Sequence, residues 1–265
     1  MKVRSPSSSI ATKPSSRARR SGRPAPWTCR RCLGELRRLG TRRNVAGMAR
    51  FGIRAKRVYG VAKPKLDALA RRIGKNHQLA LELWDSGVHD ARILAGLVDE
   101  ARLVTSRQMN RWMRDFDNWD VCDGTCCHLF VFAKPAWQKA RSWAGRKAEF
   151  QKRAGFALMA YLAVHDKRSA DREYARLLPI IRQEAHDDRN FVRKAVNWAL
   201  RQIGKRNRRL NRAAIREAER IRKIDHKAAR WIAADALREL RSAAVQRRLG
   251  QKSGRLEHAR PSGKD

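Results

Sequence analysis

Four aspartates lie close together near the middle of this 265-residue chain, at Asp115, Asp117, Asp120 and Asp123. Carboxylates at a helix start commonly cap free amide groups, and we expect this role for at least two of the four, Asp120 or its neighbours. Asp123 differs, because a helix that begins near Trp119 places these two residues four apart on one face. In such a pair the flat indole ring can pack on a sugar ring while the carboxylate faces a cation. The alternative for Trp119 is a core aromatic.

A second tryptophan, Trp198, stands among cations in the helical segment 190–203. Its helical row also contains Lys194, Arg201 and Lys205, as expected where a groove meets phosphates and sugars. The core stripe of this helix consists of apolar residues at helical spacing: Phe191, Val192, Ala195, Val196, Ala199, Leu200 and Ile203. The alternative for Trp198 is a boundary position shielded by Lys and Arg stems.

Arg153 borders an apolar helical row that contains Leu158, Tyr161 and Leu162. Its simplest expected role is a surface ion pair with Glu149, four residues earlier, which contributes only a few tenths of a kcal/mol, about 0.3. Among the other aromatic side chains, helical spacing predicts a core position for Trp84, Trp112 and Trp231. Trp137 and Trp143 stay undecided between core and surface.

The cysteines offer half of a structural zinc site, in Cys29-x-x-Cys32. The remaining ligands would have to come from distant residues, namely Cys122, Cys126, Cys127 or His128. The sequence has no glycine-rich phosphate loop, no H-E-x-x-H helix and no Gly-x-Ser-x-Gly elbow, which excludes the commonest nucleotide-binding, metalloprotease and hydrolase types. We therefore expect neither a metal nor a cofactor.

The composition indicates a binder of polyanions. The chain has 62 Lys and Arg against 25 Asp and Glu, a net charge of +37, and 42% hydrophobic residues, enough for a folded core. No run of about 18 apolar residues could span a bilayer, so we expect no membrane contact. Five cysteines are too few for a disulfide scaffold and favour a reducing compartment, the bacterial cytoplasm, where the protein would associate with the nucleoid.

The positive charge is concentrated at the two ends of the chain. Residues 1–66 contain 19 Lys and Arg and a single acid, and residues 205–265 contain 19 and 7. We predict a disordered basic tail over 1–33, one helical domain over 34–245 and a loose basic tail over 246–265. The first tail would contact a phosphate backbone. An organelle transit peptide is the alternative, although its four prolines oppose the amphipathic helix that such a peptide needs.

The hydrophobic period is helical almost everywhere between the tails, and no stretch alternates as a strand does. The sequence predicts an all-α chain of many short helices: 65–74, 77–84, 89–99, 106–114, 123–131, 135–143, 147–165, 171–185, 189–203, 211–222 and 226–241. Such helices with brief connections favour paired stacking, as in a HEAT-like or armadillo-like repeat array. A compact orthogonal bundle is the alternative, because no clean sequence repeat is present.

From Tyr59 to Leu240 the chain resembles the AlkD-type DNA alkylation repair family, which comprises HEAT-like-repeat glycosylases that release cationic alkylated purines. Four blocks in the family's order carry this resemblance: Leu83-Trp84-Asp85-Ser86-Gly87 with His89-Asp90-Ala91-Arg92; Trp119-Asp120-Val121-Cys122-Asp123; Lys152-Arg153-Ala154-Gly155-Phe156; and Lys194-Ala195-Val196-Asn197-Trp198-Ala199-Leu200-Arg201. The basic ends and Cys29-x-x-Cys32 depart from the family pattern.

The resemblance implies a role for each matching residue. Asp123 matches the catalytic carboxylate, Trp119 and Trp198 match two aromatic walls around the deoxyribose of the lesion, and Arg153 matches a phosphate-facing arginine. We add Lys194, Arg201 and Lys205 as DNA-binding residues on the row of Trp198. The family also implies that the damaged base need not enter a pocket, unlike the usual base-flipping enzymes.

We therefore expect a monomeric, metal-independent DNA glycosylase that excises N3- or N7-alkylated purines from duplex DNA. The main alternative is a non-catalytic DNA-binding scaffold in which the aspartates only cap helices. A weaker alternative is a metal-dependent nuclease that uses the four aspartates together.

Overall fold

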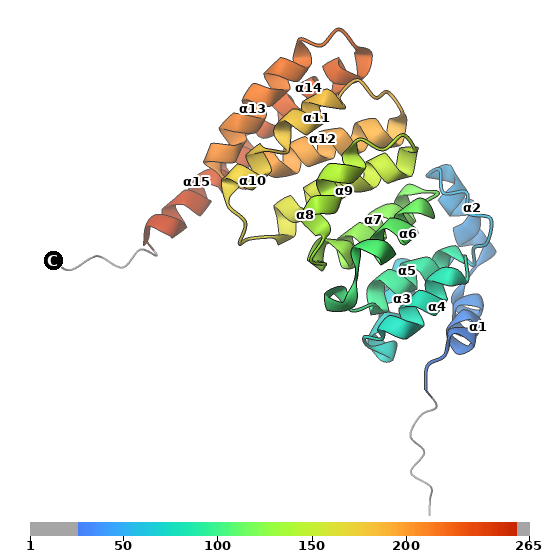
Figure 1. The fold of residues 1–265 in the computed structure, drawn as a ribbon. Coiled ribbons are helices and arrows are strands. Elements are labelled where there is room, and N and C mark those ends of the chain that lie inside the picture. Colours follow the sequence, from blue (N-terminus) through green and yellow to red (C-terminus); the bar gives the residue numbers. More distant parts are fainter. Residues whose placement is uncertain (1–25, 259–265) are drawn as a thin grey trace, which may run out of the picture.

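The computed structural model describes residues 26–258, and this range is helical with no strand (Figure 1). The N-terminal part contains α1 (Cys29–Leu39), α2 (Arg42–Arg50), α3 (Lys63–Ile73), α4 (His77–Asp85) and α5 (His89–Val98). The middle contains η1 (Ala101–Leu103), α6 (Ser106–Arg114), α7 (Trp119–His128), η2 (Phe130–Phe132), α8 (Ala136–Ala144) and α9 (Glu149–His165). The C-terminal part contains α10 (Asp171–Ala175), α11 (Leu178–Gln183), α12 (Asn190–Gly204), α13 (Arg208–Arg222), α14 (Lys227–Leu240) and α15 (Ala243–His258).

The helices stack in pairs along the chain. Within pairs, α4 packs on α5, α8 on α9 and α13 on α14. The second helices of successive pairs also contact one another, in the order α5, α7, α9, α12 and α14, and form one continuous layer. This is the HEAT-like repeat array that the helix count predicts, and not an orthogonal bundle.

Capping residues fix where the central helices begin. The side chain of Asn118 accepts from the backbone amides of Asp120 and Val121 at 3.0 and 3.1 Å, so α7 starts at Trp119 and not at residue 123. The predicted helix 171–185 is divided into α10 and α11, because Pro179 occupies the first turn of α11 and cannot continue a preceding helix.

The folded part extends further toward both ends than the predicted domain 34–245. Helix α1 starts at Cys29, where Thr28 caps it, and it buries Cys32 and Leu36 completely. Helix α15 continues to His258, through most of the segment expected to be a loose tail. The few buried apolar residues in these two helices are hard to recognise in the sequence, because many Lys and Arg residues surround them. Residues 1–25 and 259–265 lie outside the described residues.

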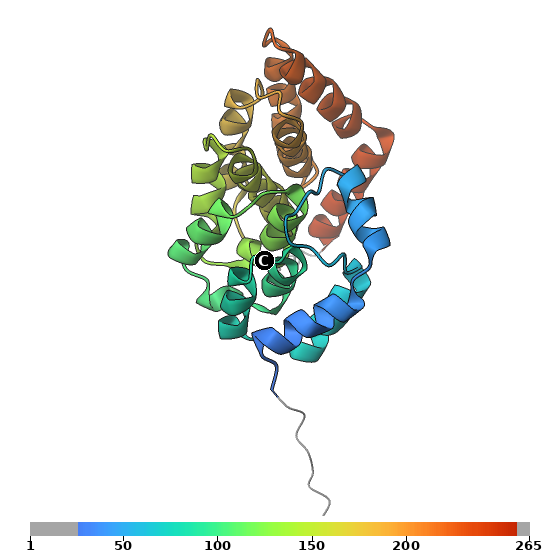
Figure 2. The same cartoon turned by 90° about the vertical axis from the view of Figure 1, so that its right-hand side faces the viewer.

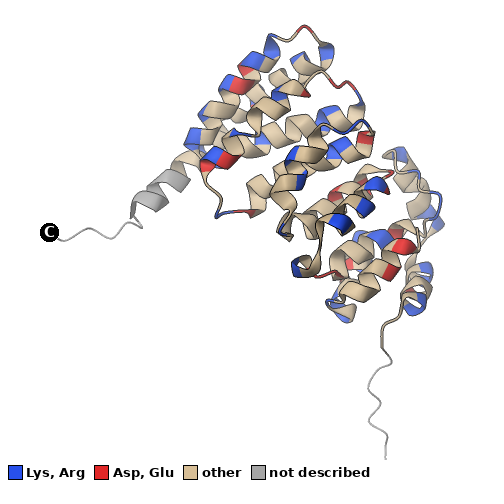
Figure 3. Ribbon diagram, in the orientation of Figure 1, with Lys and Arg blue, Asp and Glu red and all other residues tan. Residues whose placement is uncertain are grey.

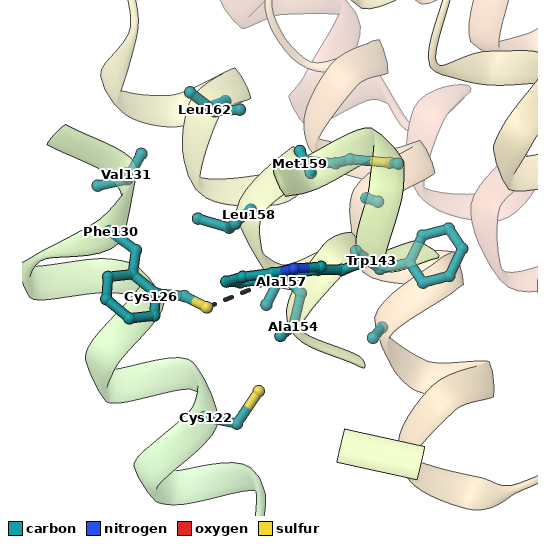
Figure 4. Close-up of a cluster of buried hydrophobic side chains, with 14 of the residues drawn as sticks. Cys122, Cys126, Phe130, Val131, Trp143, Ala154, Ala157, Leu158, Met159 and Leu162 are labelled. Carbon is teal, nitrogen blue, oxygen red and sulfur yellow. Dashed lines mark hydrogen bonds between the residues drawn. The ribbon is translucent and has the colours of Figure 1, made fainter. Parts of the chain in front are cut away.

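The core is built largely from alanine and leucine, with large aromatic rings among them. Trp84 and Trp112 are fully buried, as their spacing predicts, and their rings stack with centroids 4.0 Å apart. Trp143 is also buried, among Phe130, Cys126 and other side chains between α7 and α9 (Figure 4).

Two further tryptophans lie nearer the surface. The core prediction for Trp231 is wrong: this side chain is 37% exposed and lies under Arg193, whose guanidinium carbon is 4.6 Å from the ring centroid. The face of the Trp231 ring is covered by a cation and not by the apolar side chains that a core position would provide. Trp137 is half-buried and donates to Asp166 at 2.8 Å.

Basic side chains are spread over most helices, with acidic residues interspersed among them (Figure 3). Helix α1 packs on α4 and α5, whereas α2 buries none of its residues; both are blue in the side view of Figure 2. Within the described range, no helix has the length and apolar character needed to cross a bilayer.

Candidate active site

Asp123 lies on α7, one turn after Trp119 at the helix start. The cap by Asn118 sets this register, which places both side chains on one face as the spacing predicts. The Asp123 side chain keeps 15% of its surface exposed. It is therefore a nearly buried carboxylate that still reaches solvent.

Arg153 of α9 holds this carboxylate with two parallel hydrogen bonds. Its Nε donates to Oδ1 of Asp123 at 2.8 Å and its Nη2 donates to Oδ2 at 2.6 Å. The third donor, Nη1, reaches the backbone carbonyl of Phe191 on α12 at 2.6 Å. The ion-pair partner of Arg153 is thus Asp123 and not Glu149. One guanidinium connects α7, α9 and α12, three successive helices of the continuous layer.

Burial and charge act in opposite directions on this pair. Burial raises the pKa of Asp123 above its ordinary value, and the Arg153 guanidinium opposes that rise. Burial alone would lower the pKa of Arg153, but the Asp123 carboxylate raises it above the ordinary value. The two side chains form an ion pair in which both carboxylate oxygens accept hydrogen bonds.

Trp119 is held by the segment that follows α2. Its indole Nε1 donates to the carbonyl of Phe51 at 2.9 Å. The next residue, Gly52, has φ +78, and a Cβ there would lie 3.0 Å from the Phe191 ring. This segment therefore contacts both α7 and the start of α12, although it lies about 70 residues earlier in the chain than Trp119.

A pocket of about 840 Å³ opens beside Trp119, between α2 and the helices α5 and α7. Helix α2 buries none of its own residues and forms one wall. Its lining includes the apolar side chains of Val61 and Ile93 and the cations Arg43 and Arg50, together with the acidic Asp90 and Asp120. The pocket therefore offers an apolar surface and polar groups of both charges beside Trp119.

Trp198 occupies a boundary position on α12 and packs against Tyr161 of α9. Their ring centroids are 4.8 Å apart with an interplanar angle of 85°. Burial and the nearby Asp123 carboxylate raise the pKa of the Tyr161 phenol, so the hydroxyl stays protonated. Tyr161 thus packs on Trp198 and is affected by the charge of Asp123. Sequence reasoning placed it only in an apolar row, and no signal beyond its aromatic type marks it.

Besides Arg153, the three other cations expected to bind DNA have different surroundings. Lys194 is exposed. Arg201 is paired with Glu239 of α14, and the Lys205 ammonium lies 2.6 Å from the same carboxylate. These two cations are therefore partly neutralised by α14, a long-range partner that the sequence row does not show.

The other aspartates each have a separate partner. Asp115 accepts from the Trp84 indole at 2.8 Å, Asp117 from the Asn118 amide at 2.6 Å, and Asp120 lies 3.1 Å from the His89 ring.

The helix cap itself is Asn118, so the expected capping by Asp120 is wrong: an amide side chain one residue before the helix occupies that position. In residues 26–258 no three His, Cys, Asp or Glu side chains converge as a metal ligand set requires.

The cysteines are free thiols. Cys29 and Cys32 lie in the first turn of α1, and burial raises the pKa of Cys32 to about 11. Cys122 and Cys126 are buried against α9, where Cys126 lies 3.9 Å from the Ala154 carbonyl (Figure 4). The two sets are therefore in separate parts of the fold.

A family model described as DNA alkylation repair enzyme matches residues 32–240, most of the chain. The chain belongs to the DNA alkylation repair enzyme family. No curated protein matches it.

A solved structure has the same fold, with a TM-score of 0.68 over 84% of this chain and 97% of that one, at 20% sequence identity. That protein belongs to a new family of proteins related to the HEAT-like repeat DNA glycosylases, with affinity for branched DNA structures. The family match therefore includes every sequence-predicted site residue, and the structural likeness extends to the arrangement of the helices.

Proposed function

We propose that this member of the DNA alkylation repair family is a DNA glycosylase that releases cationic N3- or N7-alkylated purines from duplex DNA. The observation that carries the proposal is Asp123, an ionised carboxylate with an exposed edge, fixed by Arg153 one turn after Trp119. The family match and the net charge of +37 support a nucleic-acid substrate.

The chemistry needs little more than charge stabilisation. Alkylation at N7 or N3 makes the purine cationic, and it leaves with the electron pair of the C1′–N bond without prior protonation. The sugar then becomes oxocarbenium-like, and the carboxylate stabilises this cation more than the neutral ground-state sugar. Water adds to C1′ and loses a proton, which leaves an abasic site.

Arg153 prepares the carboxylate for this role. Two hydrogen bonds hold both oxygens, so Asp123 needs no reorganisation when positive charge develops on the sugar. In this proposal Trp119, one turn before Asp123, and Trp198 would each add a ring face beside the sugar, contributing about 0.5–2 kcal/mol of contact and cation attraction.

The test compares cationic with neutral lesions. Duplexes that carry N7-methylguanine or N3-methyladenine should accumulate abasic sites with the protein in excess, while an otherwise identical duplex with uracil should not. Release of uracil at a comparable rate would contradict the proposal, because a neutral base requires an acid that this site does not supply.

A non-catalytic DNA-binding protein is the second candidate, and the ion pair itself favours it. Asp123 is already matched by Arg153, which is what a purely structural carboxylate would show. This candidate predicts binding that depends on salt, with no base release from any lesion.

We further propose that the protein acts as a monomer in the cytoplasm, where its five free thiols would persist. Analytical ultracentrifugation with and without duplex DNA measures the stoichiometry; a dimer at working concentration would contradict the monomer.

A further inference from the structure

A basic pocket of about 480 Å³ lies at the C-terminal ends of α9 and α12, beyond Trp198. Four cations line it: Lys167, Lys205, Arg206 and Arg248. The amide side chains of Gln202 and Asn207 complete its polar wall, and no carboxylate is among the lining residues. The pocket therefore combines positive charge with neutral hydrogen-bonding groups, which suits an oxyanion.

Three of these cations interact with backbone carbonyls, which leave their charge in place. Arg206 donates to the carbonyls of Ala163 and Asp166 at 2.8 and 2.7 Å, and Arg248 donates to that of Lys205 at 3.4 Å. Lys167 donates to the Val164 carbonyl. Among the side chains that the structure describes, Lys205 alone of the four has a carboxylate partner, Glu239, at 2.6 Å. A further carboxylate, Asp171, accepts from the lining residue Asn207 at 2.8 Å. The described lining therefore keeps an excess of positive charge.

Packing holds Arg206 in position. Its guanidinium carbon lies 3.8 Å from the centroid of the Tyr174 ring, and its Nε is buried with no hydrogen-bond partner among the described residues. A rigid cation loses little side-chain entropy when an anion binds, so this pocket is prepared for its ligand.

The pocket continues the candidate active site along the same two helices. Trp198 and Lys205 share one row of α12, seven residues apart, which is about 10 Å along the helix. Lys167 follows α9, six residues after Tyr161. For a DNA strand that runs along α12 and advances about 3.4 Å per nucleotide, this distance corresponds to about three nucleotides.

Arg248 comes from α15, outside residues 32–240, which match the family model. Helix α15 packs on α13 and α14, and its Arg248 side chain lines the pocket. Arg248 therefore lines the pocket from outside the part of the chain that matches the family model.

We propose that this pocket binds a DNA backbone phosphate about three nucleotides from the lesion, and that α15 thereby extends the DNA footprint. The inference rests on the proposed function for the position of the lesion, but the phosphate contact itself requires no base release. The ligand is a phosphodiester within a strand, not free phosphate.

The test uses Arg248→Ala and Lys167→Ala, with Arg247→Ala as the matched control. Arg247 is the neighbouring exposed arginine of α15 and does not line the pocket. For an undamaged duplex, both pocket variants should bind several-fold more weakly, and their plot of log affinity against log salt should be less steep by about 0.9. Arg247→Ala should change neither quantity. A slope equal to that of wild type in both pocket variants, with unchanged melting temperatures, would overturn the proposal.

Shortened duplexes distinguish the ligand source. When a methylated duplex ends one base pair beyond the lesion on the side of the pocket, the difference between Arg248→Ala and wild type should disappear, while a six-base-pair extension should restore it. Competition by millimolar inorganic phosphate in wild type but not in Arg248→Ala would instead indicate a free-phosphate site. If the slope changes but no base is released, only the proposed glycosylase activity fails.

Discussion

The Arg153 guanidinium determines how much negative charge Asp123 offers to a sugar. Burial favours the protonated carboxyl, while two hydrogen bonds and one positive charge favour the ionised form. Truncating either partner leaves a buried charge uncompensated. A substitution of either residue therefore also changes the charge balance of the other.

Arg153→Gln is expected to shift the pH dependence of base release. Activity requires ionised Asp123, so it falls as pH drops through the Asp123 pKa. Because Arg153 lowers that pKa, its removal raises it further, and the acid limb should move to higher pH. Single-turnover rates measured across pH check this. Arg189→Gln, which removes a similar ion pair with Asp187, serves as the control; an acid limb at the same pH in both variants would contradict the electrostatic role.

At the scale of the helix, α7 carries both Trp119 and Asp123, and its start is fixed by a single cap. The Asn118 side chain is 1% exposed and accepts two backbone amides. An error in this cap would rotate or fray the first turn, which contains Trp119. The cap therefore links local sequence to the geometry of the site.

Asn118→Ala should reduce the free energy of unfolding by about 1 kcal/mol and also slow base release. Thr105→Ala provides the comparison, because Thr105 caps α6 through one hydrogen bond to Gln108 at 3.1 Å and lies away from the site. It should lose similar stability without loss of rate. Chemical denaturation and single-turnover kinetics measure the two effects, and equal rates in both variants would show that α7 does not need this cap to position the site.

Gly155 lets α9 approach α8 closely, two residues after Arg153 in the same helix. A Cβ at Gly155 would lie 2.4 Å from the Ala144 backbone nitrogen. Gly155→Ala should therefore destabilise the fold by about 1–3 kcal/mol, since helix backbones must separate. Gly145→Ala is the control, because no atom lies within 4 Å of a Cβ there. Equal melting temperatures for the two variants would contradict this close packing.

At the scale of the whole molecule, ion pairs connect successive helix pairs. Burial alone would raise the pKa of Asp187, but hydrogen bonds from Arg189 and Lys152 lower it to about 2. Lys152 also contacts Glu184 at 2.5 Å, so one cluster joins α9 to the segment between α11 and α12. This cluster makes the stability of the array depend on pH.

A lowered pKa in the folded state contributes stability above the unfolded value, near 3.9, and that stability is lost as pH falls toward 2. The wild-type free energy of unfolding should therefore drop in this window, and Asp187→Asn should remove on the order of 2 kcal/mol of the dependence. Urea titrations at several pH values measure it. Asp117→Asn, at an exposed position, should keep the full pH dependence; loss of the same amount in both variants would contradict the assignment.

The hydrophobic periodicity predicted most helices and the row of residues around Trp198 on α12, because both follow from which residues of a helix face the core. It could not predict that Arg153 reaches Asp123 thirty residues earlier, since the ion pair crosses between helices. The hydrogen bond from Trp119 to the Phe51 carbonyl joins residues that lie even further apart in the sequence, by 68 positions. Helices α1 and α15 were missed for a different reason: a few buried side chains, such as Cys32 and Leu249, anchor segments whose composition is mainly basic.

The rate of base release by Asp123→Asn at saturating protein tests the central claim most directly. Asp117→Asn is the matched control, and Asp123→Asn with Arg153→Gln restores charge balance if the single variant folds poorly. We predict that both Asp123→Asn proteins bind methylated duplex as tightly as wild type yet release N7-methylguanine at least 100-fold more slowly, a loss of about 2.7 kcal/mol in transition-state stabilisation. Release at the wild-type rate by a folded, DNA-bound Asp123→Asn protein would contradict the account.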